Sequence, residues 1–247
     1  MTTRLTVFPL DGIPEIEAGD DLVALLAEAA ARAGGFEDAD VLVVAQKIIS
    51  KSEGRVVSLE GIEPSDHARE LAGDRDPRHV ETILRESARV VRSRPPLVIS
   101  ETRHGFVCAS AGVDASNAKG EGTLVLLPVD PDASAARIRE GLRERTGREV
   151  GVIVSDSFGR PFRQGTTDVA LGVAGVRAIL DLTGQRDRAG YELQGTEIAV
   201  ADELAGAAQL VMGKTDGNPA AIVRGIDLRG DGTGRDLVIP AERDLFR

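Results

Sequence analysis

The sequence predicts a mixed α+β protein rather than a regularly alternating α/β sheet. Two uninterrupted apolar runs, Val41–Ala45 and Val150–Val154, have the length and the β-branched composition of strands buried on both faces. Segments with helical periodicity lie between the strand-like segments, but their order is irregular. Irregular alternation of this kind favours the α+β class.

The other expected elements follow from capping residues and from the spacing of apolar residues. Asp20 or Asp21 can cap a helix that runs to about Ala33, and Asp76 followed by Pro77 can open another. The segment after Gly230 is rich in Gly and Asp, and we expect it to be mobile. The remaining expected strands are Arg4–Phe8, Leu97–Ser100, Phe106–Ser110, Thr123–Leu127 and Ala220–Val223, and the later helices are Asp76–Val91, Ala133–Thr146 and Thr196–Val211.

Composition argues against several classes of protein. The 247 residues carry a formal net charge of −10, so we expect no nucleic-acid partner, because that affinity rests on Lys and Arg. Cys108 is the only cysteine, which excludes an intramolecular disulfide and fits a cytoplasmic location. No apolar run approaches the ~20 residues that cross a bilayer, so we expect no membrane partner.

The common nucleotide and hydrolase fingerprints are absent. Gly213-Lys214-Thr215 is similar to the end of a phosphate loop, but Ala208 stands where that motif requires a glycine. The three histidines have no metal-ligand spacing, and there is no nucleophile elbow of the GxSxG type. The sequence therefore excludes P-loop enzymes, zinc proteases and serine hydrolases of these kinds.

Four segments that connect predicted elements carry more charged, hydroxyl and amide side chains than an ordinary connecting loop needs. Each also has a structural alternative: a solvated helix start, a turn rich in Asp and Asn, or a tight turn with surface arginines. The segments are Ile13-Pro14-Glu15, the stretch Lys47–Ser52, the stretch Asp114–Asn117, and Ser155-Asp156-Ser157 followed by Arg160 and Arg163.

Taken together, these segments indicate phosphoryl-transfer chemistry. Asp114 and Asp156 are each followed by hydroxyl or amide groups, and oxygen ligands of this kind suit Mg²⁺ or Mn²⁺. Arg160 and Arg163 can hold phosphate or carboxylate oxygens, as can Lys47 and Lys51. Charge neutralisation without a general-base histidine is typical of phosphoryl transfer. We also expect the glycines of this region to let backbone approach a ligand closely; they are Gly159, Gly165, Gly172 and Gly175.

Four long motifs make the chain resemble the F420-0:gamma-glutamyl ligase family over about residues 8–225. They occur in the order "VVAQKIISKSEGRVV", "ETRHGFVCASAGVDASN", "SDSFGRPFRQGTTDVALGVAG" and "VADELAGAAQLVMGK". Members occur alone or as the N-terminal domain of a two-domain F420 ligase. The resemblance implies a ligase that uses GTP and Mn²⁺ or Mg²⁺, with K⁺ as a further candidate ion, to join L-glutamate to F420-0 through an acyl phosphate. Further gamma-linked glutamates follow.

The resemblance also implies an unusual two-domain α+β fold, with mixed sheets, in an intertwined homodimer. We place the first domain at residues 1–72 plus 190–247 and the second at 73–189. Carried onto this sequence, the metal positions are Asp114, Asp156 and Ser157. The nucleotide positions are Ile13, Pro14, Glu15, Ile16, Gln46, Lys51 and Asn117, to which we add Gly213 and Lys214. Arg160 and Arg163 are candidate catalytic residues from their chemistry alone.

The chain departs from the family pattern at three places, one of which is Gln46, where some relatives have a hydroxyl residue. Thr166 replaces the glutamine of a common Gly-Gln-Thr-Asp motif, and Lys214 stands where many members carry an oxygen donor that is thought to reach the metal. A protonated lysine cannot ligate a metal, but it can bind phosphate. These departures leave two alternatives open: an amide ligase of the same mechanism acting on another carboxylate, and a non-catalytic nucleotide-binding domain of a larger ligase.

Overall fold

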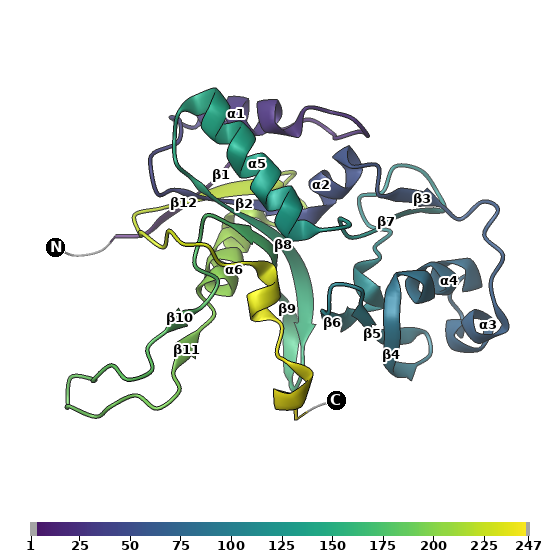
Figure 1. Ribbon diagram of the computed structural model, residues 1–247. Coiled ribbons are helices and arrows are strands. Elements are labelled where there is room, and N and C mark those ends of the chain that lie inside the picture. Colours follow the sequence, from purple (N-terminus) through teal and green to yellow (C-terminus); the bar gives the residue numbers. More distant parts are fainter. Residues whose placement is uncertain (1–3, 246–247) are drawn as a thin grey trace.

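The computed structural model describes residues 4–245 and confirms the α+β class. Its centre is a five-stranded sheet in which β2 and β8 run parallel and all other neighbours run antiparallel (Figure 1). The strand order is β1 (Thr6–Pro9), β12 (Ala220–Arg224), β2 (Val41–Ala45), β8 (Gly151–Arg160) and β9 (Arg163–Ala174).

Helices cover both faces of this sheet, as the apolar runs predict. Successive side chains of a strand point to opposite faces. Leu42 and Val44 therefore pack under α1 (Leu22–Arg32) and α5 (Pro131–Thr146), while Val41 and Val43 pack against α6 (Val200–Met212). The carboxyl ends of β2 and β8 are consequently held by two aliphatic cores, one on each side.

A smaller α+β unit lies beside the sheet and has its own core around Val80, Ile83 and Leu124. Its helices are α3 (Asp66–Ala72) and α4 (Pro77–Glu86). Strand β3 (Val56–Ser58) pairs with β7 (Thr123–Val125). A separate three-stranded sheet contains β4 (Ser87–Arg94), β5 (Leu97–Thr102) and β6 (Val107–Ala109). The short helix α2 (Gln46–Ser52) leads from β2 towards this unit (Figure 1). An extended arm carries β10 (Leu180–Asp181) and β11 (Glu197–Ile198).

The central sheet combines strands from both segments that the sequence assigns to separate domains. Strands β1, β2 and β12 come from residues 1–72 and 190–247, and β8 and β9 come from residues 73–189. The domain boundaries remain a prediction. Among residues 4–245, no helix has both the length and the apolar content needed to cross a membrane.

Two helix boundaries and the C-terminal segment differ from expectation. The helix expected over 76–91 ends at Glu86, because the following residues pair with β5 as strand β4 and tertiary pairing overrides the helical pattern. The last helix begins at Val200 rather than Thr196, since residues 197–198 form β11. The segment after Gly230 is packed, not loose: it forms short 3₁₀ turns at Gly234–Leu237 and Ala241–Arg243, and the first lies against β9.

Strand β9 was not expected, and it changes the role of the glycines. A Cβ on Gly172 would lie 2.2 Å from the carbonyl oxygen of Pro131, at the start of α5. Gly172 therefore lets a helix approach the strand, and the expectation that it makes room for a ligand is wrong. Gly159 and Gly165 lie in the β8–β9 hairpin with nothing within 4 Å of an added Cβ.

Candidate active site

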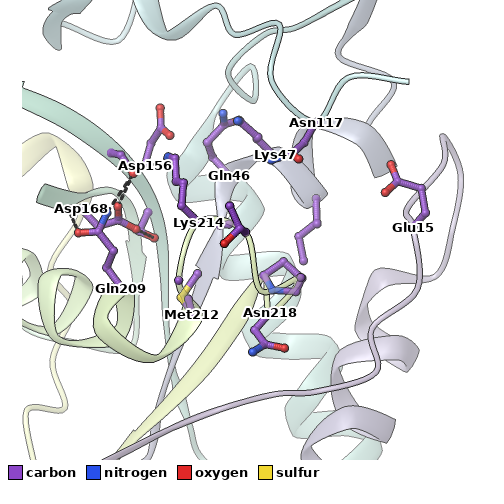
Figure 2. Close-up of a pocket in the computed structure, with 18 residues that line it drawn as sticks. Glu15, Gln46, Lys47, Asn117, Asp156, Asp168, Gln209, Met212, Lys214 and Asn218 are labelled. Atoms are coloured by element: carbon purple, nitrogen blue, oxygen red, sulfur yellow. Dashed lines mark hydrogen bonds between the residues drawn. The ribbon is translucent and has the colours of Figure 1, made fainter. Parts of the chain in front are cut away.

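A cavity of about 250 Å³ opens where β2 and β8 end. Because these two strands are parallel neighbours, their carboxyl ends meet at one edge of the sheet, which is the usual ligand position in sheets of this kind. Figure 2 shows Asp156, Asp168 and Gln209 grouped on one side of the cavity, with Gln46, Lys47 and Asn117 across from them and Lys214 between.

The wall formed by β8, β9 and α6 is a connected hydrogen-bond network around the buried carboxylate of Asp168. Ser155 Oγ donates to Asp168 at 3.1 Å and Ser157 Oγ donates at 2.6 Å. Gln209 accepts from the backbone N–H of Asp168 at 3.2 Å and donates to Ser157 Oγ at 3.2 Å. Lys214 Nζ also donates to Ser157 Oγ, at 2.9 Å. These contacts fix the Ser157 hydroxyl at the cavity wall.

Asp156 lies in this wall without an ion pair among residues 4–245. Burial raises the pKa of its carboxyl from 3.8 to about 6, and the nearby charge of Asp168 adds to this effect. The Ser157 backbone N–H, Lys47 and Lys214 act in the opposite direction but do not outweigh burial. A half-buried carboxylate with too little positive charge around it is a favourable position for a cation.

The α2 side of the cavity places Lys47 against Asp114. Lys47 Nζ lies 2.6 Å from Asp114 Oδ2 and donates to Ser116 Oγ at 2.6 Å. Burial alone would raise the pKa of Asp114, but hydrogen bonds from Lys47 and Ser116 together hold it below its usual value. Asp114 is therefore ionised and already neutralised by one cation.

A second cavity of about 180 Å³ adjoins the first, and Glu15 lines both. Lys51, which is buried in α2, forms a 2.5 Å ion pair with Glu15. Ile16, Val56 and Val125 give this second cavity a mainly apolar lining. The interpretation of the α2 segment as a solvated helix start is wrong, because Gln46, Ser50 and Lys51 are all buried.

The structure brings most of the sequence-derived candidates together. Those that line the first cavity are Glu15, Gln46, Asn117, Asp156, Ser157, Gly213 and Lys214, while Ile16 and Lys51 line the second. Asp114 lines neither cavity and forms an ion pair with Lys47. Ile13 packs against the core of the central sheet, and Pro14 is exposed. Sequence reasoning missed Asp168 and Gln209 as site residues. The signal for Gln209 was a single amide in the apolar run "AGAAQLVM".

Arg160 and Arg163 lie away from the cavity. They are strand partners at the tip of the β8–β9 hairpin, and both are exposed. The tip is three residue positions beyond the Ser157–Asp168 pair, or roughly 10 Å along the strand. Arg160 donates to the Gln164 carbonyl at 3.1 Å, and neither arginine lines the cavity. Thr166, one of the three family departures, is also exposed in this hairpin.

Comparison with known proteins decides the family. A family profile described as F420-0:Gamma-glutamyl ligase matches residues 12–225. The chain belongs to this family. It is 48% identical to the Coenzyme F420:L-glutamate ligase of Methanothermobacter thermautotrophicus, over 98% of this chain and 99% of that protein. The enzymes of the same name from Methanopyrus kandleri and Archaeoglobus fulgidus are 46% and 43% identical, over 98% and 97% of their own lengths.

Family membership gives a context for the cavity. The matched region contains every residue that lines it, from Glu15 to Pro219. Lys214, another of the three departures, contacts Ser157 rather than taking the place of an oxygen donor. Gln209, in the last turn of α6, supplies a side-chain amide at the same wall.

Proposed function

We propose that this protein is a cytoplasmic, GTP-dependent ligase that joins L-glutamate to F420-0 and then adds further gamma-linked glutamates. The single observation that carries the proposal is the family match along the chain, which includes the whole cavity. The names of the relatives, Coenzyme F420:L-glutamate ligase, supply the two substrates. The cavity supports the proposal with carboxylates, hydroxyls and lysines at the ends of two parallel strands.

A divalent ion, Mn²⁺ or Mg²⁺, fits the residues present, and K⁺ is a further candidate ion. Within residues 4–245, no group of three or more His, Cys, Asp or Glu is arranged to hold a metal. Mg²⁺ and Mn²⁺, however, take few carboxylates together with hydroxyl, amide, water and phosphate oxygens. Asp156 and Ser157 would hold the ion, with Asp114 as a further ligand once Lys47 releases it. When bound, the ion neutralises charge on phosphate oxygens.

The proposed reaction has two steps and balances without a redox partner. A carboxylate oxygen of F420-0 attacks the terminal phosphorus of GTP, so that GDP leaves and an acyl phosphate forms. The amine of glutamate then attacks the acyl carbon, an amide bond forms, and phosphate and one proton are released. Lys47, Lys51 and Lys214 are placed to hold anionic oxygens in both steps, where positioning and charge neutralisation contribute most.

The hairpin arginines enter the proposal through a homodimer. The β8–β9 tip projects from the sheet, and Phe162 at its end is 91% exposed. We propose that the intertwined dimer covers this tip, so that Arg160 and Arg163 meet substrate carboxylates at the site of a second copy. Because both arginines are exposed in the protomer, no rearrangement of its core is needed for this role.

One reaction tests the proposed function. The purified chain is mixed with F420-0, L-glutamate, GTP and Mn²⁺, and the coenzyme is followed by mass spectrometry. We expect stepwise glutamyl additions that disappear when GTP or the metal is left out. Binding of GTP without any addition would overturn the proposal for F420-0, and would favour another carboxylate substrate or a partner domain.

A further inference from the structure

The most informative group outside the network of Asp168 is the side-chain amide of Gln46. Gln46 is the first residue of α2, it is fully buried, and it lines the first cavity (Figure 2). Its Nε2 is buried and has no hydrogen-bond partner among residues 4–245. An unpaired buried N–H group is unfavourable, and native proteins rarely keep one without a reason. A hydrogen-bond acceptor of a ligand in the cavity can therefore pair with Gln46 Nε2.

Ser50 pairs with the acceptor end of the amide. It lies one turn further along α2, where side chains four residues apart are neighbours, and it too is fully buried. Its hydroxyl donates to Gln46 Oε1 at 2.8 Å. An amide has an acceptor end and a donor end, and this hydrogen bond uses the acceptor end. Gln46 is consequently oriented so that the end without a protein partner is a donor.

The surrounding charges indicate what this donor meets. Lys47 is the next residue in the same cavity, and Lys51 faces the adjoining one. Asp114 and Glu15 are the carboxylates on this side, and each already has a lysine partner. A donor that lines the same cavity as the Lys47 ammonium group is matched to an anionic oxygen, because hydrogen bonds to charged acceptors are the stronger ones.

We propose that Ser50 is a positioning residue that fixes Gln46 as a hydrogen-bond donor to an anionic oxygen of the ligand. The oxygen belongs to a phosphate of the nucleotide or to a carboxylate of a substrate. This inference rests on the proposed function for the identity of the ligands. The contact between Ser50 and the Gln46 amide is independent of that function.

The test is a double-mutant cycle of Ser50→Ala and Gln46→Met, with Ser52→Ala as the matched control. Ser52 lies in the same helix, donates to a backbone carbonyl at 2.8 Å and lines neither cavity. Calorimetry with GDP and Mn²⁺ reports the phosphate source, and KM for F420-0 and glutamate at saturating GTP reports the carboxylate source. The melting temperature of each variant checks folding, and Ser50→Cys, a near-isosteric weak donor, replaces Ser50→Ala if that variant does not fold.

We expect Gln46→Met to weaken one of these two ligands by roughly ten- to a hundredfold, and Ser50→Ala to weaken the same ligand by roughly two- to tenfold. In the Gln46→Met background, Ser50→Ala should have no further effect, because Ser50 acts through Gln46. Gln46→Glu should weaken the same ligand strongly, since an acceptor then faces the anion. Ser52→Ala should bind as the wild type does.

Two results would overturn the inference. Additive effects of the two substitutions would make Ser50 a packing residue, and unchanged binding of both ligands in Gln46→Met would mean that Nε2 meets only water. Failure of the proposed function is distinguishable from both. If the wild type binds GDP but adds no glutamate to F420-0, the calorimetric cycle still decides the role of Ser50.

Discussion

Replacing Asp156 by Asn should stabilise the metal-free protein at neutral and alkaline pH while abolishing ligation. Asp156 is the carboxylate of the cavity that has no ion pair among the described residues, and burial raises its pKa from 3.8 to about 6. Asparagine has the same shape and no charge. It therefore removes the unfavourable burial of the ionised carboxylate, and it also removes the proposed metal ligand.

The sign and the size of the stability change in Asp156→Asn follow from the linkage between protonation and folding. The folded-state pKa lies above the unfolded value, so this group contributes most favourably below about pH 4, and that contribution is lost as pH rises through about 6. A shift of about two units corresponds to about 3 kcal/mol above pH 7. For a chain of this size, 3 kcal/mol corresponds to roughly 6–12 °C in melting temperature. Near pH 4 the gain should fall below about 1 kcal/mol.

The assay is thermal unfolding in EDTA at pH 8 and at pH 4, repeated with Mn²⁺ at pH 8. Asp156→Asn should melt above the wild type at pH 8 and close to it at pH 4, and Mn²⁺ should stabilise only the wild type. Glu203→Gln, an exposed substitution on α6, is the control and should change stability by less than about 0.5 kcal/mol. Equal melting temperatures of Asp156→Asn and wild type at pH 8 would refute the reasoning.

Three further predictions test other parts of the structure. Lys47→Met removes the cation that lowers the pKa of Asp114, so the free energy of unfolding should fall at neutral pH. The difference from wild type should shrink below pH 3.8, where the Asp114 carboxylate of the wild type becomes protonated. Thermal unfolding measured at several pH values tests this. Gly172→Ala should destabilise by about 1–3 kcal/mol in urea, because its Cβ would lie 2.2 Å from a backbone oxygen of α5, whereas Gly159→Ala, with nothing within 4 Å, should be near neutral. Arg163→Ala should raise KM for a carboxylate substrate without lowering the melting temperature; an unchanged KM would remove Arg163 from the proposed site.

Local patterns were sufficient to predict the elements that hold the site. Val41–Ala45 and Val150–Val154 are apolar on both faces, and the structure buries them between α1, α5 and α6. The polar segments that follow these runs were predicted to carry chemistry, and Lys47 and Asp156 from them both line the cavity. Chemistry at the end of a buried strand is predictable because the strand itself is.

What could not be predicted depends on pairing between distant segments. Residues 163–167 carry no large apolar side chain and are exposed or half-buried, so no alternation indicates a strand. Strand β9 forms because β8 extends beyond its apolar run and offers a partner. The same hairpin carries Arg160 and Arg163 away from the cavity, although they follow Asp156 closely in sequence. Gln209 reaches the cavity only through the packing of α6 on β9.

The arrangement of charges in the cavity gives an order to ligand binding. Lys47 neutralises Asp114, Lys51 neutralises Glu15, and Lys214 is held by Ser157, so each lysine has an exchangeable partner. Asp156 alone of the cavity carboxylates has neither an ion pair nor the hydroxyl donors that Asp168 has. The proposed metal ion should therefore bind first at Asp156, where it offsets the unfavourable burial of an ionised carboxylate. Under the proposed function, anionic ligands would then draw the lysines from their carboxylates, and Asp114 would become available as a further ligand of the ion. Nucleotide affinity should accordingly rise when metal is present, and metal affinity should rise by the same factor when nucleotide is present.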